Sequence, residues 1–147
     1  MVLEHGRPTG YRYAAANTLP KGIRMKRNQI DEFETLHGQL QAFHTEMNTL
    51  VKKNPSDALN KFKLGLANSI LIKANSFLGK ARLPFAEFQS FDESAMPSTS
   101  DVLMILAQYL SAFEKFRADN IYKDAYGDDW YWDGGEIPAR APRKLEK

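Results

Sequence analysis

The sequence predicts an all-α fold, an antiparallel three-helix bundle in up-down-up order, with an extended N-terminal arm and an irregular aromatic C-terminal segment. Three observations support this prediction: apolar residues repeat at helical spacing in three segments, proline or glycine separates these segments, and strand-like alternation is nearly absent. With 147 residues, 43% of them hydrophobic, the chain can form one core without disulfides. We therefore expect a bundle domain over residues 28–121, with helices at about 28–53, 55–78 and 99–120.

Residues 1–27 have no sustained periodicity and predict an extended basic arm. They contain two prolines, and six basic residues against one acidic residue. They also lack the apolar stretch of a signal peptide, and no apolar run in the chain approaches the roughly 20 residues of a membrane span. We therefore expect a soluble, cytoplasmic protein.

The segment 28–53 has the clearest helical pattern in the chain. Its apolar residues recur at alternating steps of three and four, the spacing of a narrow helical seam. They are Phe33, Leu36, Leu40, Phe43, Met47 and Leu50. Asn28 is the predicted N-cap, and Lys52 and Lys53 at the other end favour the negative end of the helix dipole.

Asn54-Pro55 separates the first helix from the second, because a residue before proline avoids helical backbone angles and proline suits the first helical turn. Apolar residues cover more than half of the circumference over 55–78, so this helix should be the central one. Asn68 and Asn75 are one heptad apart and form a row. We expect this row to be a solvent-exposed stripe rather than a polar ladder between helices.

Gly79 is the predicted end of the second helix, and a long connection follows over residues 80–98. Three phenylalanines at steps of three, Phe85, Phe88 and Phe91, should share one side of a short turn and cap the bundle. Ser98 is positioned to cap the third helix. Because three helices leave faces uncovered, self-association into a larger bundle is a further hypothesis.

Residues 122–147 join an acidic, aromatic stretch, YGDDWYWDGG, to a basic, proline-containing tail that we expect to be exposed. The indoles either fold back on the end of the bundle or form a docking surface, because aromatic rings dominate binding energy at protein interfaces. The predicted partner-binding residues are Tyr126, Asp128, Asp129, Trp130, Tyr131, Trp132 and Asp133.

Charge is distributed unevenly along the chain, although the net charge is only +2. Residues 1–82 carry 13 Lys and Arg against 6 Asp and Glu, and residues 83–147 carry 7 against 12. The basic part predicts either a nucleic-acid backbone site or lysines that solvate an apolar helix. The residues of this alternative site are Arg7, Tyr11, Arg12, Tyr13, Lys21, Arg24, Lys26, Arg27, Lys61 and Lys63.

Catalytic and metal-binding patterns are poorly represented in the sequence. There is no cysteine, and the single Glu-x-x-His spacing, Glu34 to His37, lacks the second copy that a bundle metal site requires. His37 and His44 are two turns apart, too far to chelate one ion together. A calcium loop starting at Asp129 would have Arg140 where a bidentate glutamate belongs. We therefore predict no catalytic residues, no metal and no cofactor.

Three functions follow in order of support. The first is a non-catalytic helical interaction protein, a small subunit or adaptor that docks onto protein partners in a larger assembly. The second is a protein that binds the nucleic-acid backbone through the arm and the second helix. The third is an unrecognised hydrolase or metal protein, which is disfavoured because no nucleophile and base occur in a known motif.

Overall fold

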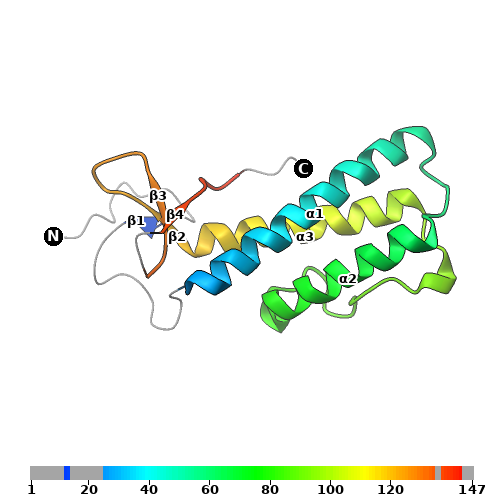
Figure 1. The fold of residues 1–147 in the computed structure, drawn as a ribbon, viewed down its shortest axis with the longest axis horizontal. Helices are drawn as coiled ribbons and strands as arrows, with labels where there is room; N and C mark the ends of the chain where they lie inside the picture. The colour runs from blue at the N-terminus through cyan, green and yellow to red at the C-terminus, as the bar shows by residue number, and fades with distance from the viewer. Residues whose placement is uncertain (1–11, 14–24, 135–136, 144–147) are drawn as a thin grey trace. The chain divides into compact units, whose positions relative to one another are not determined.

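The computed structural model describes residues 12–13, 25–134 and 137–143. The helices in this part of the chain are α1 (Arg27–Lys53), α2 (Lys61–Leu78) and α3 (Thr99–Asp119), with short 3-10 helices at Lys80–Arg82 and Glu93–Ala95 (Figure 1). The chain divides into a helical unit, residues 33–113, and a sheet unit made of the described residues up to 32 and from 114 on. The mostly helical class is confirmed.

The helical unit is held together at one end by three aromatic rings, one from each helix. The Phe33 and Phe113 rings are stacked with centroids 5.2 Å apart, and Phe77 lies 5.8 Å from each of them. All three helices bury apolar residues along one side in this unit, among them Leu40, Leu71 and Leu106. The core is therefore the shared seam that the heptad spacing predicts.

The direction of the helices differs from the predicted up-down-up order, which is wrong. The start of α3 lies beside the end of α1, because the Thr99 hydroxyl donates to the Asn54 carbonyl at 2.8 Å. The ends of α2 and α3 lie together, as the Phe77 and Phe113 rings show. α2 and α3 therefore run parallel to each other and antiparallel to α1.

Side-chain hydrogen bonds explain this direction by holding the connection 79–98 along α2, so that the chain returns to the starting end before α3 begins (Figure 1). Asn68 donates to the Phe91 carbonyl at 2.9 Å and accepts from the Phe91 amide at 2.8 Å. Asn75 donates to the Gln89 carbonyl at 2.8 Å and accepts from the Tyr109 hydroxyl. The Asn68 and Asn75 row is therefore a set of anchors for the connection, and the expected solvent-exposed stripe is wrong.

The helix starts follow local capping chemistry. α1 starts at Arg27, one residue before the predicted N-cap Asn28, and the Lys26 amide donates to the Gln29 side chain at 2.9 Å. α2 starts six residues later than Pro55, because Asn60 is its N-cap and accepts from the Lys63 amide at 2.8 Å. Residues 54–60 instead pair with the segment before α3, through a bridge between Ala58 and Ser98.

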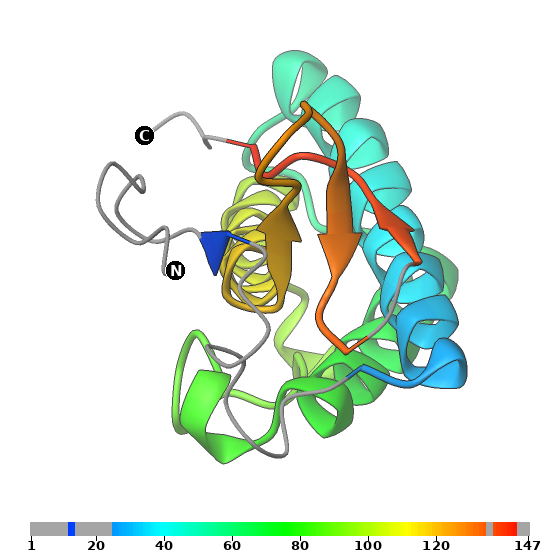
Figure 2. The same ribbon diagram turned by 90° about the vertical axis from the view of Figure 1, so that its left-hand side faces the viewer.

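The sheet unit contains four short strands in the order β1-β2-β3-β4, seen side by side in Figure 2. They are β1 Arg12–Tyr13, β2 Ile121–Lys123, β3 Trp130–Trp132 and β4 Pro138–Ala139. β2 and β3 form an antiparallel hairpin, and β1 pairs with β2 in parallel. The chain is therefore mostly helical with a small sheet that the all-α prediction lacked, and the prediction of an irregular C-terminal segment is wrong, because the aromatic stretch pairs as a strand.

None of the helices in the described residues has the length and apolarity that crossing a bilayer requires.

Candidate docking surfaces

The outward side of α2 carries apolar side chains that nothing in the helical unit covers. The buried residues Leu64, Ala67, Leu71, Ala74 and Leu78 form one stripe that turns the other side of the helix outward. On that side the Phe62 side chain is 76% exposed and Leu66, one turn later, is 44% exposed. We name the outer α2 face by its exposed members: Lys61, Phe62, Leu66, Ser69, Ile72, Lys73 and Ser76.

The charges of α2 are all positive, because residues 61–78 contain three lysines and no Asp or Glu. Lys61 and Lys73 are exposed. Lys63 is engaged within the unit, since its ammonium lies 2.7 Å from the Glu46 carboxylate. The hydrogen bond and the charge of Lys63 lower the pKa of Glu46 below its ordinary value. The outer α2 face therefore combines apolar surface with two lysines that are not used in this ion pair.

A second exposed surface lies at the tip of the hairpin between β2 and β3. The Asp124 amide donates to the Asp129 carbonyl at 2.8 Å, and the Asp124 carboxylate accepts from the Tyr126 amide at 3.1 Å. This turn presents Tyr126, whose side chain is 94% exposed, between aspartates. Asp128 and Asp129 are exposed, and Lys123 lies 3.5 Å from the Asp128 carboxylate. We call Tyr126, Asp128 and Asp129 the hairpin tip.

The predicted partner-binding residues do not form one surface. Besides the exposed hairpin tip, Trp130 and Tyr131 are half-buried, and Trp132 and Asp133 are buried. Trp132 is only 1% exposed, with the Arg117 guanidinium 5.6 Å from its ring centroid. The Asp133 backbone bonds to Asn120 and to Met25. Trp132 and Asp133 therefore belong to the interior of the sheet unit.

A buried ion cluster lies near Trp132 and was missed from the sequence. Glu114 is 4% exposed, and its carboxylate is 2.6 Å from the Arg140 guanidinium and 3.7 Å from Arg117. It also accepts from the Arg143 amide at 3.3 Å. The tail is therefore bonded to the sheet unit as far as Arg143, while Pro138, Ala141 and Arg143 are exposed, as expected of the tail. Buried charges require such pairing, so the cluster has a structural explanation.

The residues of the alternative nucleic-acid site are only partly described. Arg7, Tyr11, Lys21 and Arg24 lie outside the described residues, and Arg12 and Tyr13 are described only as strand backbone. Lys26 and Arg27 are exposed before and at the start of α1, and Arg27 forms an ion pair with Asp31 at 3.5 Å. In the helical unit Lys61 is exposed and Lys63 is paired with Glu46.

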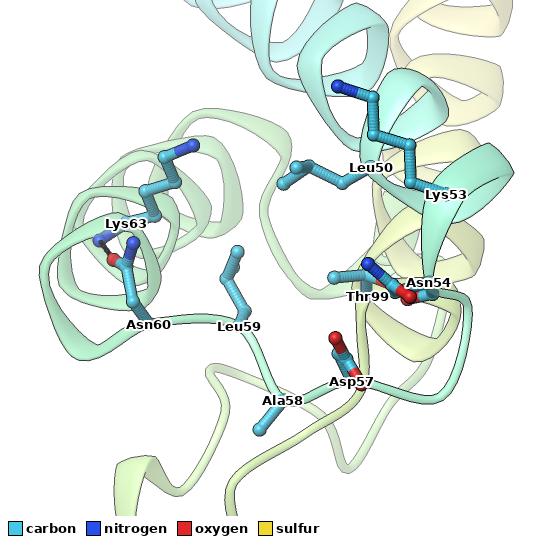
Figure 3. Close-up of a pocket in the computed structure, with 9 residues that line it drawn as sticks. All are labelled: Leu50, Lys53, Asn54, Asp57, Ala58, Leu59, Asn60, Lys63 and Thr99. Carbon is cyan, nitrogen blue, oxygen red and sulfur yellow. Dashed lines mark hydrogen bonds between the residues drawn. The ribbon is translucent and has the colours of Figure 1, made fainter.

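A small cavity of about 200 Å³ lies in the helical unit, where α1 ends and α2 and α3 begin (Figure 3). Its walls are Leu50, Lys53, Asn54, Asp57, Ala58, Leu59, Asn60, Lys63 and Thr99. Several of its polar groups already have partners. Asn60 caps α2, Lys63 pairs with Glu46, and the Thr99 hydroxyl donates to the Asn54 carbonyl. This arrangement joins the three helices, and it does not pair a nucleophile with a base.

The two histidines considered for metal binding both lie on α1. His37 is buried against the Phe33 ring, with centroids 6.0 Å apart, and His44 is half-buried. The described residues contain no group of three or more His, Cys, Asp or Glu that could hold an ion.

Comparison of the sequence with protein-family models and curated proteins, and of the structure with solved structures, returns no match.

Proposed function

We propose that this chain is a non-catalytic interaction protein, a subunit or adaptor, that docks through the outer α2 face onto a protein surface that is apolar and acidic. The observation that carries the proposal is the pair of exposed apolar side chains, Phe62 and Leu66, on a helix without any acidic residue. An i, i+4 apolar pair on a helix is a common anchor for helix and groove partners. Lysines beside the pair favour acidic residues in the partner.

The expected binding energy is modest and comes mainly from the apolar pair. Complete burial of a Phe or Leu side chain contributes about 1.5–3 kcal/mol. Because Phe62 and Leu66 are 76% and 44% exposed, docking would add about 2–3 kcal/mol from the two together. Lys61 and Lys73 would act mostly on the association rate and on the choice of partner, and their effect falls with salt.

Protein is favoured over the nucleic-acid alternative by the composition of this face. Phosphate contacts need cations and hydrogen-bond donors, and Phe62 and Leu66 supply neither. Phenylalanine can stack on unpaired bases, but leucine has no such role. Lys63, one of the lysines in that alternative, is already paired with Glu46. The apolar pair therefore distinguishes the two functions.

The experiment uses a synthetic amphipathic helical peptide with leucines on one face and glutamates on the other. Its control is the same peptide with every glutamate replaced by lysine. We expect the acidic peptide to bind the full chain, more weakly at high salt, and the basic peptide not to bind. The double variant Phe62→Ser/Leu66→Ser should weaken binding about 30- to 100-fold, the equivalent of 2–3 kcal/mol.

Met104→Ser is the matched control variant, because Met104 is also an exposed apolar residue but belongs to α3. It should leave peptide binding unchanged. Equal binding of both peptides, or equal loss in the control variant, would contradict the proposed face. Binding of a generic oligonucleotide that depends on Lys61 and survives the Phe62→Ser/Leu66→Ser change would support the nucleic-acid function instead.

A further inference from the structure

We infer that one partner of the outer α2 face is the hairpin tip of a second copy of this chain. The inference rests on the proposed function, since it names the acidic, partly apolar surface that the lysines and the apolar pair would accept. The hairpin tip has that composition: Tyr126 is the most exposed large hydrophobic residue described, and Asp128 and Asp129 flank it.

The two surfaces have opposite charge. Residues 123–129 contain one lysine and three aspartates, whereas α2 contains three lysines and no acidic residue. Within the tip, Lys123 lies near Asp128, and the Asp124 carboxylate holds the turn. Asp129 and the outer side of Asp128 remain exposed to approach Lys61 or Lys73 of another copy, which lie about 18 Å apart along α2. This arrangement uses the uneven charge of the chain, which the net value of +2 conceals.

The hairpin tip also has a shape that suits a helix face. Its turn is fixed by two hydrogen bonds, from the Asp124 and Tyr126 amides, so little conformational entropy is lost when Tyr126 becomes buried. A tyrosine ring can pack against Phe62 and Leu66 while its hydroxyl stays in contact with water. Ser69, one turn after Leu66, is small and leaves room beside the apolar pair.

A symmetric contact between two α2 helices is disfavoured by the same charges. In such an isologous pair, each α2 face meets a copy of itself, so Lys61 and Lys73 would approach lysines with no acidic residue on either helix to pair with them. Contact between the outer α2 face of one copy and the hairpin tip of another pairs unlike surfaces instead. Such a contact closes into a twofold dimer when it forms reciprocally and gives rings or open chains when it repeats, so in each case the assembled fraction should rise with protein concentration.

Charge exchange between the two surfaces tests this inference. The first variant, Lys61→Asp/Lys73→Asp, has two acidic surfaces, and the second, Asp128→Lys/Asp129→Lys, has two basic ones. Sedimentation velocity at low salt should show concentration-dependent assembly of the wild-type chain and monomers of each variant. An equimolar mixture of the variants should assemble again, because each acidic surface then meets a basic one. All four positions are exposed, so circular dichroism should remain unchanged.

Several results would overturn the inference. They are a wild-type chain that remains a monomer at every concentration, assembly that persists in either variant alone, or a mixture of variants that stays monomeric. Binding of the acidic helical peptide shows whether the proposed function fails as well, or only the inference that a second copy is the partner. The variant Asp128→Lys/Asp129→Lys keeps the outer α2 face and should still bind that peptide. If the wild-type chain binds the peptide but does not self-assemble, only the second copy is rejected as the partner, and the proposed function stands.

Discussion

Asn68→Ala tests whether the connection after α2 is held by the asparagine row. The substitution removes two hydrogen bonds, to the amide and to the carbonyl of Phe91. Each neutral hydrogen bond contributes about 1 kcal/mol net, and more where the abandoned partner is shielded from water. Phe91 is half-buried, so water replaces the lost partner only in part. Alanine recovers about 0.5 kcal/mol through its higher helix propensity. The expected loss in free energy of unfolding is about 2 kcal/mol.

Urea denaturation followed by circular dichroism measures this loss, and hydrogen exchange at the Phe91 amide locates it. Exchange of that amide should be about 30-fold faster in the variant, because 1.4 kcal/mol corresponds to a tenfold change in an equilibrium. The matched control is Ser69→Ala, an exposed neighbour on the same helix, which should be neutral or stabilising by about 0.5 kcal/mol. If Asn68→Ala behaves like this control, the row does not anchor the connection and our explanation of the helix order fails.

Three other changes test separate parts of the fold. Glu114→Gln removes the carboxylate charge beside Arg117 and Arg140 and should cost about 3 kcal/mol in urea unfolding, because removing one partner of a buried ion pair is strongly destabilising. Gly79→Ala should cost about 1 kcal/mol or more because φ is +73° there, whereas Gly38→Ala, inside α1 with no atom near the added methyl, should stabilise by up to about 1 kcal/mol. Lys63→Gln should raise the pKa of Glu46 toward its ordinary value of 4.5, which carboxyl NMR can measure. In the wild type, the stabilisation from this ion pair is fully present above pH 4.5 and is lost as the pH falls through the lowered pKa of Glu46.

The helices could be predicted because their signals are local. The seam that includes Phe33 and Leu40 is buried as its spacing indicates, and Ser98 caps α3 through a bond from the Asp101 amide at 3.2 Å. The start of α2 was missed because Asn54-Pro55 and Asn60 both carry helix-start signals. The contacts of residues 54–60 with the segment before α3 decide between them, and those contacts are not local.

The helix order could not be predicted, because it depends on where a 20-residue connection bonds. Asn68 and Asn75 have the same spacing whether they face water or backbone, and only the position of residues 89–91 distinguishes the two. The sheet was missed for a related reason. WYW is too short to show the alternation of a strand, and its pairing partner IYK directly follows α3. Glu114 and Arg140 are 26 residues apart, so no sequence window joins the buried pair.

The burial of Trp132 changes which part of the aromatic segment can act on other molecules. A strand alternates its side chains, so burying Trp132 at one end of β3 constrains the neighbouring Tyr131 to the other side. The aromatic residue of this segment that is exposed is Tyr126, at the hairpin tip. An exposed tyrosine between aspartates and an exposed phenylalanine on a helix with lysines both carry apolar surface that a contact would bury. The opposite charges of the two surfaces are the reason for the contact between copies inferred above, which charge exchange can test directly.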